Sequence, residues 1–190
     1  MTRIIAGSAG GRRLTVPSGR RTRPTSDRAR EGLFATLESI LGTLAGRRFL
    51  DLYAGSGAVG LEALSRGAAH ALLVDSDRQV ATTIRANARL LALADAVVRT
   101  LAVERLVTDS PPGEPYDVAF LDPPYDLPDD AVRAVLRGLA THGWLAGEAV
   151  TVVERPSRAG DFGWPTGFRA ERARRYGEGT LWYGRADNGQ

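Results

Sequence analysis

Short apolar runs alternate with amphipathic stretches through the middle of the chain. Continuous or alternating apolar residues are typical of strands, whereas apolar residues at positions i, i+3 and i+4 are typical of helices. The apolar runs predict strands at 48–53, 70–75, 96–101, 117–121 and 149–154. The amphipathic stretches predict helices at 57–66, 77–92, 103–108 and 129–140. Such strand-helix-strand repetition predicts a parallel sheet with right-handed crossovers.

The two ends of the chain depart from this repetition. Ser26 is placed to cap a helix over residues 27–41, whose apolar residues fall on one face. After residue 155, strand-like runs at 168–175 and 180–184 flank a glycine-containing turn and predict an antiparallel hairpin.

Residues 3–16 predict two short strands around a glycine-rich turn, followed by a basic linker. A disordered basic tail is the alternative for this segment. We therefore expect a doubly wound, Rossmann-like α/β sheet, mainly parallel, with a C-terminal antiparallel hairpin and a basic N-terminal hairpin extension. The predicted organisation is an extension over 1–25 and one domain over 26–190.

Composition narrows the class of protein. The chain has 190 residues, 43% of them hydrophobic, which suits one domain with appendages. It has no cysteine, so disulfides and thiolate metal sites are excluded. No apolar run approaches the roughly 20 residues of a membrane span. We expect a cytoplasmic monomer that needs no metal and does not bind membranes.

The net charge of +3 is unevenly distributed. Residues 1–30 hold eight arginines and one acid, residues 31–168 hold twelve arginines and eighteen acids, and residues 169–190 hold five arginines and three acids. Arginine clamps phosphates through paired N–H donors. The sequence therefore predicts nucleic-acid contacts near the N-terminus. The candidate residues are Arg3, Arg12, Arg13, Arg20, Arg21, Arg23 and Arg28.

The clearest candidate for chemistry follows the fourth predicted strand, at Asp122-Pro123-Pro124-Tyr125. The prolines force a stiff turn without amide donors, so a carboxylate, a bare carbonyl and an aromatic ring remain. These groups suit a flat nucleobase whose exocyclic amine is held by two acceptors and whose ring is stacked. An ordinary surface turn is the alternative.

A glycine-rich loop follows the first strand and precedes a helix, over residues 51–60. This context is that of a nucleotide-binding loop, which NAD-binding proteins share. Asp51 would repel a pyrophosphate and attract a cationic ammonium or sulfonium. Asp75, at the end of the second strand, can accept both ribose hydroxyls, although a helix N-cap is its alternative role.

In sheets of this type, ligands lie at the carboxyl ends of the strands where the strand order reverses. If the fourth strand lies beside the first, the glycine loop and Asp122 face one crevice. This arrangement favours a site for methyl transfer from S-adenosylmethionine to an amine.

The chain resembles class I S-adenosylmethionine-dependent methyltransferases with an Asp/Asn-Pro-Pro-Tyr/Phe motif, and within them the RsmD-like family of ribosomal RNA guanine-N2 methyltransferases. The specific segments are Arg23-Pro-Thr25 and Glu62-Ala-Leu-Ser-Arg-Gly67, and the match also covers 3–7, 11–14, 28–34, 51–60, Asp75 and 121–125. Ala35 stands where the family often has Asn, and Leu101 where an acid often follows the third strand.

The resemblance implies transfer of a methyl group to the N2 amine of a guanine in small-subunit (16S) ribosomal RNA, in a ribosomal particle, with S-adenosylhomocysteine as product. The implied catalytic residues are Asp122, Pro123, Pro124 and Tyr125. The implied cofactor residues are Asp51, Ala54, Gly55, Ser56, Gly57, Asp75, Ser76, Ala102 and Val103. An adenine-N6 DNA methyltransferase, a dinucleotide-dependent oxidoreductase and a catalytically silent RNA-binding assembly factor remain as alternatives.

Overall fold

The computed structural model describes residues 2–16 and 26–187. Helices and strands alternate as the apolar pattern predicts. The helices are α1 (Asp27–Leu41), α2 (Ala58–Ser65), α3 (Arg78–Leu90), α4 (Val103–Leu106), α5 (Asp129–Thr141) and the short 3-10 helix η1 (Ser157–Ala159). The strands are β1 (Arg48–Leu52), β2 (His70–Asp75), β3 (Ala96–Thr100), β4 (Tyr116–Leu121), β5 (Leu145–Pro156), β6 (Phe168–Tyr176) and β7 (Gly179–Ala186).

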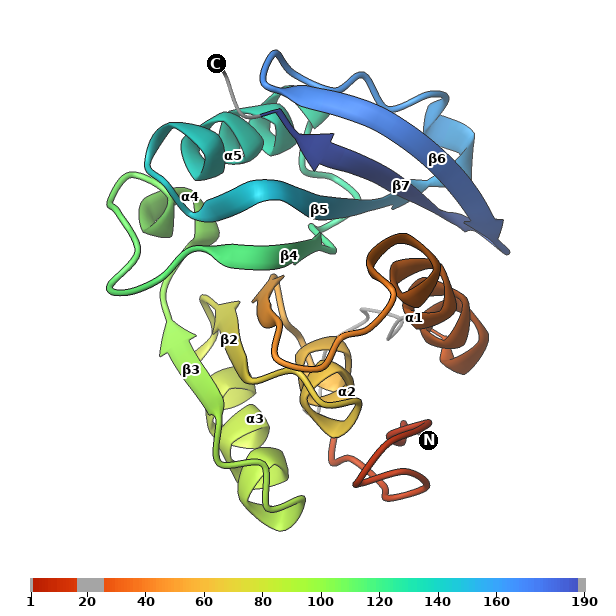
Figure 1. Ribbon diagram of the computed structural model, residues 1–190, viewed down its shortest axis with the longest axis vertical. Coiled ribbons are helices and arrows are strands. Elements are labelled where there is room, and N and C mark those ends of the chain that lie inside the picture. Colours follow the sequence, from red (N-terminus) through yellow and green to blue (C-terminus); the bar gives the residue numbers. More distant parts are fainter. Residues whose placement is uncertain (1, 17–25, 188–190) are drawn as a thin grey trace.

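The strands form one sheet in the order β3-β2-β1-β4-β5-β7-β6 (Figure 1). Strands β1 to β5 are parallel, whereas β7 is antiparallel to both β5 and β6. The predicted fold class is confirmed. The order reverses at β1, which lies between β2 and β4.

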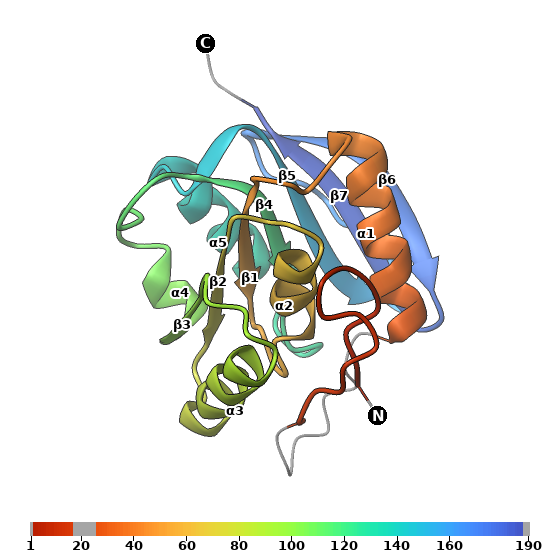
Figure 2. The same cartoon turned by 60° about the horizontal axis from the view of Figure 1, so that its bottom comes forward.

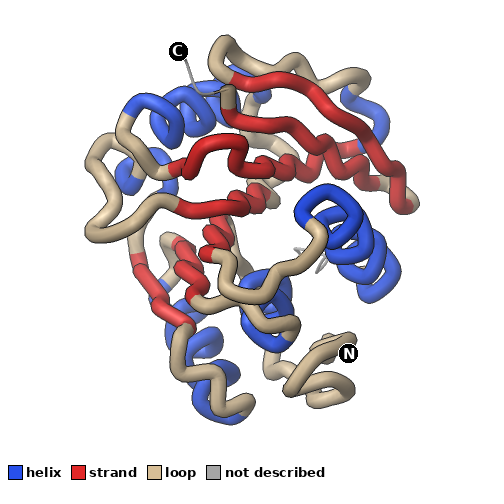
Figure 3. The backbone as a smooth tube through the Cα atoms, viewed as in Figure 1, coloured by secondary structure: helices blue, strands red, loops and turns tan. Residues whose placement is uncertain are grey.

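Helices cover both faces of the sheet, as the ribbon and tube views show (Figures 2 and 3). Apolar residues of α1, α2 and α3 share one buried cluster with strand residues such as Phe49 and Phe120. Residues of α4 and α5 share another with Leu50 and Leu121. Successive side chains of a strand point to opposite faces, so each central strand contributes to both clusters.

Two helix starts follow the predicted capping chemistry. Ser26 accepts a hydrogen bond from the Ala29 N–H at 3.2 Å and caps α1. Asp77 caps α3, because its Oδ1 accepts from the N–H groups of Gln79 and Val80. Asp75 is therefore not the cap of α3.

Strand β5 is longer than predicted, and α4 is shorter. The β4–β5 pairing shifts register between Tyr116 and Val118, which lets β5 extend back to Leu145. Within the added stretch, Glu148 adopts a φ of 59°, in the left-handed region. Such a residue interrupts the alternation that marks a strand in the sequence.

The N-terminal segment 2–16 forms a closed loop instead of two regular strands. A single antiparallel bridge joins Arg3 and Arg13, and the Ile4 N–H donates to the Arg12 carbonyl at 2.9 Å. Ile4 and Leu14 are buried in the same cluster as α1 and α2. The segment thus packs on the α1 side of the sheet, near α2 (Figure 2).

Within the described residues, no helix is long and apolar enough to cross a membrane.

Candidate functional site

The loops after β1 and β4 meet at one edge of the sheet. Leu52 pairs with Leu121 in the parallel register, and the Asp122 N–H donates to the Leu52 carbonyl at 3.4 Å. The predicted neighbourhood of the glycine loop and Asp122 is confirmed by this register, since both loops leave adjacent strand ends.

Asp51 lies beneath the first turns of α2. Its Oδ2 accepts from the Gly60 N–H at 2.8 Å, and only 1% of the residue is exposed. Burial raises the pKa of Asp51 from 3.8 to about 8; the Gly60 hydrogen bond opposes this shift, and the nearby Asp75 charge adds to it. A buried carboxylate of this kind is stabilised by a nearby cation.

Asp75 ties the ends of β1, β2 and β3 together. Its Oδ2 accepts from the Gly55 N–H at 3.1 Å, and its Oδ1 accepts from the Asp77 N–H at 3.0 Å. Its backbone carbonyl accepts from the Leu101 N–H, which brings residues 101–103 to the same edge. Ser76 and Ala102 are exposed there, whereas Val103 is buried at the start of α4.

The glycine loop takes the shape predicted for a backbone that approaches a ligand closely. Gly55 and Gly57 have φ values of 55° and 76°, and Gly57 caps α2. The Ala54 N–H donates to the Val74 carbonyl. A Cβ on Gly57 would lie 3.0 Å from Ile84 Cγ2, so a side chain there meets both backbone strain and crowding.

Sequence reasoning missed Asn87, which lies behind this loop. Asn87 is buried on α3; its Nδ2 donates to the Ser56 carbonyl at 3.4 Å and to the Thr15 carbonyl at 2.9 Å. Its Oδ1 accepts from the Thr15 N–H. The glycine loop and the end of segment 2–16 therefore share one buried amide.

The acceptor loop after β4 is more open. Asp122 is half-buried, Pro123 is buried and Pro124 is exposed. Tyr125 is 49% exposed, an unusual surface position for a large aromatic residue. The Pro124 carbonyl accepts from the Leu127 N–H at 3.0 Å and so closes the turn.

Arg155, at the end of β5, donates hydrogen bonds to the acceptor loop and to the start of α5. Sequence reasoning missed this residue. Its guanidinium donates to the carbonyls of Pro124 (3.3 Å) and Leu127 (2.6 Å) and to Asp129 Oδ1 (2.8 Å). Arg155 is only 4% exposed. The only sequence feature that could have indicated Arg155 is its position just after the mostly apolar run 149–153.

Tyr53 and Glu104 form a second contact that sequence reasoning missed. Tyr53 follows β1 with a φ of 61°, and its hydroxyl donates to Glu104 Oε1 on α4 at 2.8 Å. Burial, together with the Glu104 carboxylate, raises the pKa of Tyr53. Left-handed backbone at a non-glycine residue is frequent at functional sites.

The described arginines of the predicted RNA-binding set lie around segment 2–16 and the start of α1. Arg3 pairs with Asp27 at 3.3 Å, Arg12 donates to the Leu90 carbonyl, and Arg13 and Arg28 are exposed. Arg20, Arg21 and Arg23 lie outside the described residues.

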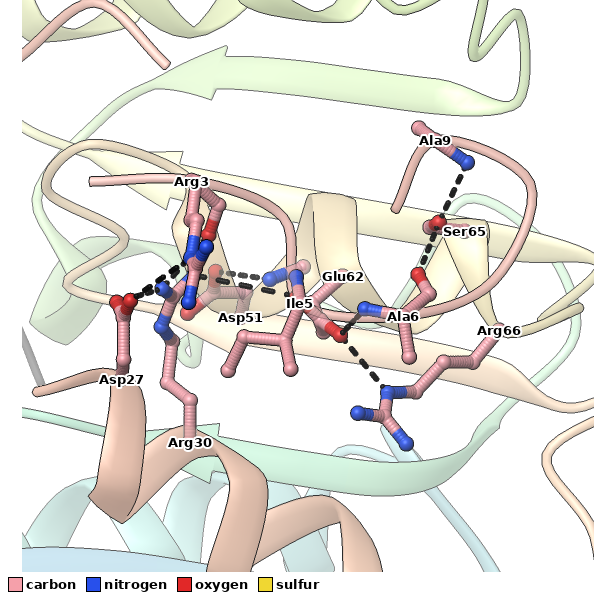
Figure 4. A network of polar contacts seen from close by, with 11 residues as sticks. Arg3, Ile5, Ala6, Ala9, Asp27, Arg30, Asp51, Glu62, Ser65 and Arg66 are labelled. Atoms are coloured by element: carbon pink, nitrogen blue, oxygen red, sulfur yellow. Dashed lines mark hydrogen bonds and ion pairs between the residues drawn. The ribbon is translucent and has the colours of Figure 1, made fainter. Parts of the chain in front are cut away.

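A buried polar network joins segment 2–16 to α1 and α2 (Figure 4). Glu62, fully buried, accepts from the N–H groups of Ile5 and Ala6 and from Arg66 Nε. The buried Arg30 lies 4.0 Å from Glu62 and donates to Asp27. The network explains why Arg30 is tolerated in the first turn of α1, where a cation is unfavourable.

No group of three or more metal-binding side chains occurs within residues 2–16 and 26–187.

The strand order, the glycine loop and the two carboxylates at the ends of β1 and β2 define a Rossmann-like methyltransferase. The family model described as "Conserved hypothetical protein 95" matches residues 2–185, and the chain belongs to this family. The resemblance to the RsmD-like family is confirmed.

Named relatives agree with this assignment. The chain is 40% identical over 153 residues to "Ribosomal RNA small subunit methyltransferase D" of Escherichia coli (strain K12), covering 80% of this chain and 73% of that protein. It is 35% identical over 167 residues to "Putative rRNA methyltransferase YlbH" of Bacillus subtilis (strain 168), covering 84% and 88%. The solved structure of the "Putative methyltransferase yhhF from Escherichia coli" superimposes with a TM-score of 0.86 at 32% identity, covering 99% of both chains.

Proposed function

We propose that this protein transfers a methyl group from S-adenosylmethionine to the N2 amine of a guanine in small-subunit ribosomal RNA. The main support is the position of Asp122 and Tyr125 on a loop that leaves the sheet beside the glycine loop. The names of the relatives, which are ribosomal RNA methyltransferases, support the choice of RNA.

The residues at the ends of β1 and β2 suit this cofactor. The buried carboxylate of Asp51 favours a positive charge, and S-adenosylmethionine carries an ammonium and a sulfonium. Asp75 would accept the ribose hydroxyls, since a carboxylate offers about four acceptor positions. Ala54, Ser56 and the glycines would line the methionine portion, and the backbone at Ala102 and Val103 would contact the adenine.

The acceptor loop would hold the guanine. The Asp122 carboxylate and the Pro123 carbonyl would accept the two hydrogens of the N2 amine, while the exposed ring of Tyr125 stacks on the base. Pro124 would act through the shape of the turn, because its carbonyl already bonds Leu127 and Arg155.

The cofactor supplies an activated methyl group on its sulfonium. In the transfer, the N2 amine would gain the methyl group from the sulfonium and lose one proton, which the Asp122 carboxylate would accept. Two acceptors on the amine counter the delocalisation of its lone pair into the ring, so positioning and electrostatics provide most of the acceleration. A paired guanine must leave its helix to reach the loop.

The arginines of segments 2–16 and 17–28 would bind phosphates around the target, in an assembling or assembled subunit. A small chain acting on a large RNA gains recognition from a preassembled partner. We expect the protein to work as a cytoplasmic monomer.

The test is a labelling experiment with radioactive S-adenosylmethionine. Unmodified small subunits, the deproteinised RNA and duplex DNA are incubated with the wild-type protein and with Asp122→Ala. We expect label on ribosomal RNA as N2-methylguanosine, at least about 100-fold weaker in the variant, because lost transition-state acceptors have effects of this size.

Three results would contradict the proposal. Label on DNA as N6-methyladenine would assign the protein to adenine-N6 DNA methylation. Tight cofactor binding without label on any substrate would favour a silent assembly factor. Full activity of Asp122→Ala would show that the Asp122 carboxylate of the acceptor loop has no role in methyl transfer.

A further inference from the structure

The outer edge of the sheet opposite β3 is formed by β6, which is basic and exposed (Figure 1). Of its nine residues, Phe168 is buried, Tyr176 is partly buried and the seven between them are exposed. Four of those seven are arginines, at 169, 172, 174 and 175. These residues were not among the arginines that the sequence pointed to as RNA contacts.

At the end of the β6–β7 hairpin far from the turn, acids neutralise the arginines. Arg169 lies 3.2 Å from Glu148 and 3.1 Å from Asp187. Arg185 lies 2.5 Å from Glu171 and 3.9 Å from Glu148. This end of the hairpin therefore presents little net positive charge.

The end of the hairpin at the turn differs. Across the described part of the chain, Arg172 and Arg174 have no carboxylate within ion-pair distance. Arg175 donates to the Gly177 carbonyl and stabilises the turn. Glu178 is the single acid in the turn. Positive charge is thus concentrated at one end of an otherwise neutralised hairpin.

That end lies at the edge of the sheet where the candidate site is. Gly179, which begins β7, pairs with Pro156, at the end of β5. Because β5 is parallel to β4, the hairpin turn is at the same edge as the acceptor loop. Tyr176 also packs on α1: a Cβ on Gly32 would lie 2.0 Å from the Tyr176 hydroxyl.

Arg172 and Arg174 share the face of the sheet that α1 covers. They pair with Tyr183 and Leu181, which belong to the buried cluster with α1. Directly paired residues of antiparallel strands point to the same face. The two arginines therefore lie on the α1 side of β6, and the first turn of α1 carries the exposed Arg28. Figure 2 shows α1 beside β6 and β7.

We infer that Arg172 and Arg174 form a second phosphate-binding surface for the RNA substrate, at the same edge of the sheet as the acceptor loop. The inference rests on the proposed function. Guanidinium groups without acidic partners bind phosphates through paired N–H donors. RNA that delivers a guanine to Asp122 would then contact the hairpin arginines as well as those of segment 2–16 and α1.

Another reason for the arginines is protection of the edge strand against pairing with other chains. Charged side chains and bulges have this role, and β6 has a register shift between Ala170 and Arg172. Charged residues at any position along the strand would protect the edge. Here the arginines without acidic partners lie in the half of β6 nearer the turn. The two explanations predict different RNA binding.

The test compares Arg172→Gln/Arg174→Gln with a control of equal charge, Arg99→Gln/Arg137→Gln. The control arginines are exposed on β3, the opposite edge strand, and on α5, which packs on the other face. Affinity for deproteinised small-subunit RNA is measured across salt concentrations, together with cofactor affinity and methylation of subunits.

We expect the hairpin variant to bind RNA severalfold to tenfold more weakly at low salt. The slope of log affinity against log salt should fall by about one to two, because each phosphate contact on a single strand contributes about 0.7. Cofactor affinity should not change in either variant. The control should keep the wild-type slope.

Equal slopes for the hairpin variant and the control would overturn the inference and leave edge protection as the role of the arginines. A defect confined to assembled subunits would also overturn it, because the partner would then be a ribosomal protein. If the wild-type protein neither binds nor methylates RNA, the proposed function itself fails, and the inference fails with it.

Discussion

The loops after β1 and β4 follow neighbouring strands, yet side chains of opposite charge type support them. Carboxyl groups support the β1 loop, and a guanidinium supports the β4 loop. The β1 loop presents backbone N–H groups, and carboxylates accept them: Asp51 from Gly60 and Asp75 from Gly55. The β4 loop contains prolines and presents carbonyls, and Arg155 donates to two of them. Each loop is fixed by the charge that complements its backbone.

The difference has a consequence for the ligands. The buried Asp51 carboxyl beneath the β1 loop favours a cationic cofactor, because a cation stabilises its ionised form. Beneath the β4 loop, Arg155 instead pairs with the carboxylate of Asp129. Mutations that remove one support should therefore affect one half of the reaction and spare the other.

Among the residues that support the two loops, Arg155→Gln is expected to have the largest effect. The change removes the guanidinium donor from the carbonyls of Pro124 and Leu127, of which Pro124 keeps the Leu127 N–H, and it removes the ion pair with Asp129. We expect turnover to fall about 10- to 100-fold, because even a small misplacement of the reacting groups lowers the rate of the chemical step strongly. The free energy of unfolding should fall by about 2–4 kcal/mol. Cofactor affinity should be unchanged. Single-turnover methylation, calorimetric cofactor binding and denaturant unfolding measure these quantities.

The matched control for Arg155 is Arg133→Gln on α5. Arg133 also bonds an aspartate and a carbonyl, Asp130 and Gly163, but its ion pair is at the surface. Its loss should lower stability by less than about 1 kcal/mol. If both variants lose the same turnover and the same free energy of unfolding, the buried position of Arg155 beneath the loop does not matter for catalysis.

Gly60→Ala should instead weaken the β1 loop. A Cβ at this position would lie 2.7 Å from Leu73 Cδ2 and 3.0 Å from Asp51 Oδ2, so Leu73, Asp51 or α2 must shift. Overpacking of this kind costs about 1–3 kcal/mol. We expect cofactor affinity to fall about tenfold with little change in turnover at saturating cofactor.

The control for Gly60 is Gly113→Ala, where a Cβ would meet no atom within 4 Å. Cofactor affinity of the control should equal that of the wild type. A Gly60→Ala protein with normal cofactor affinity would show that the Asp51 contact does not shape the β1 loop.

The sequence predicted the two loops but not what supports them. Strand ends and glycines are local signals, so 51–60 and 122–125 could be found from short windows. Arg155 reaches back 31 residues to Pro124, and Glu62 reaches 57 residues to Ile5. Such pairs depend on how helices and strands pack together, and a short window of sequence holds no information about that packing. The predicted N-terminal hairpin is present as a single antiparallel bridge, and Glu62 and Ser65 accept hydrogen bonds from the backbone N–H groups of Ala6 and Ala9 between its two arms.

The last effect concerns the proton on Asp51, and it tests whether the cofactor's positive charge lies beside this carboxyl. Burial raises its pKa from 3.8 to about 8, which favours the neutral form of Asp51 in the cofactor-free protein at neutral pH. Without cofactor, the free energy of unfolding should fall as pH rises from about 4 towards about 8, because the unfolded chain ionises first.

A cofactor cation favours the ionised carboxylate, so binding at pH 7 should release a proton from Asp51. Cofactor affinity should then rise by up to about tenfold per pH unit between pH 6 and about 8, which corresponds to 1.36 kcal/mol per unit. Calorimetry in two buffers of different ionisation enthalpy measures the release directly. Asp51→Asn keeps an acceptor for the Gly60 N–H but has no proton to lose, so its binding should release none from this position. Equal proton release by both proteins would mean that the cofactor's positive charge lies away from Asp51, and the electrostatic contrast between the two loops would no longer explain cofactor binding.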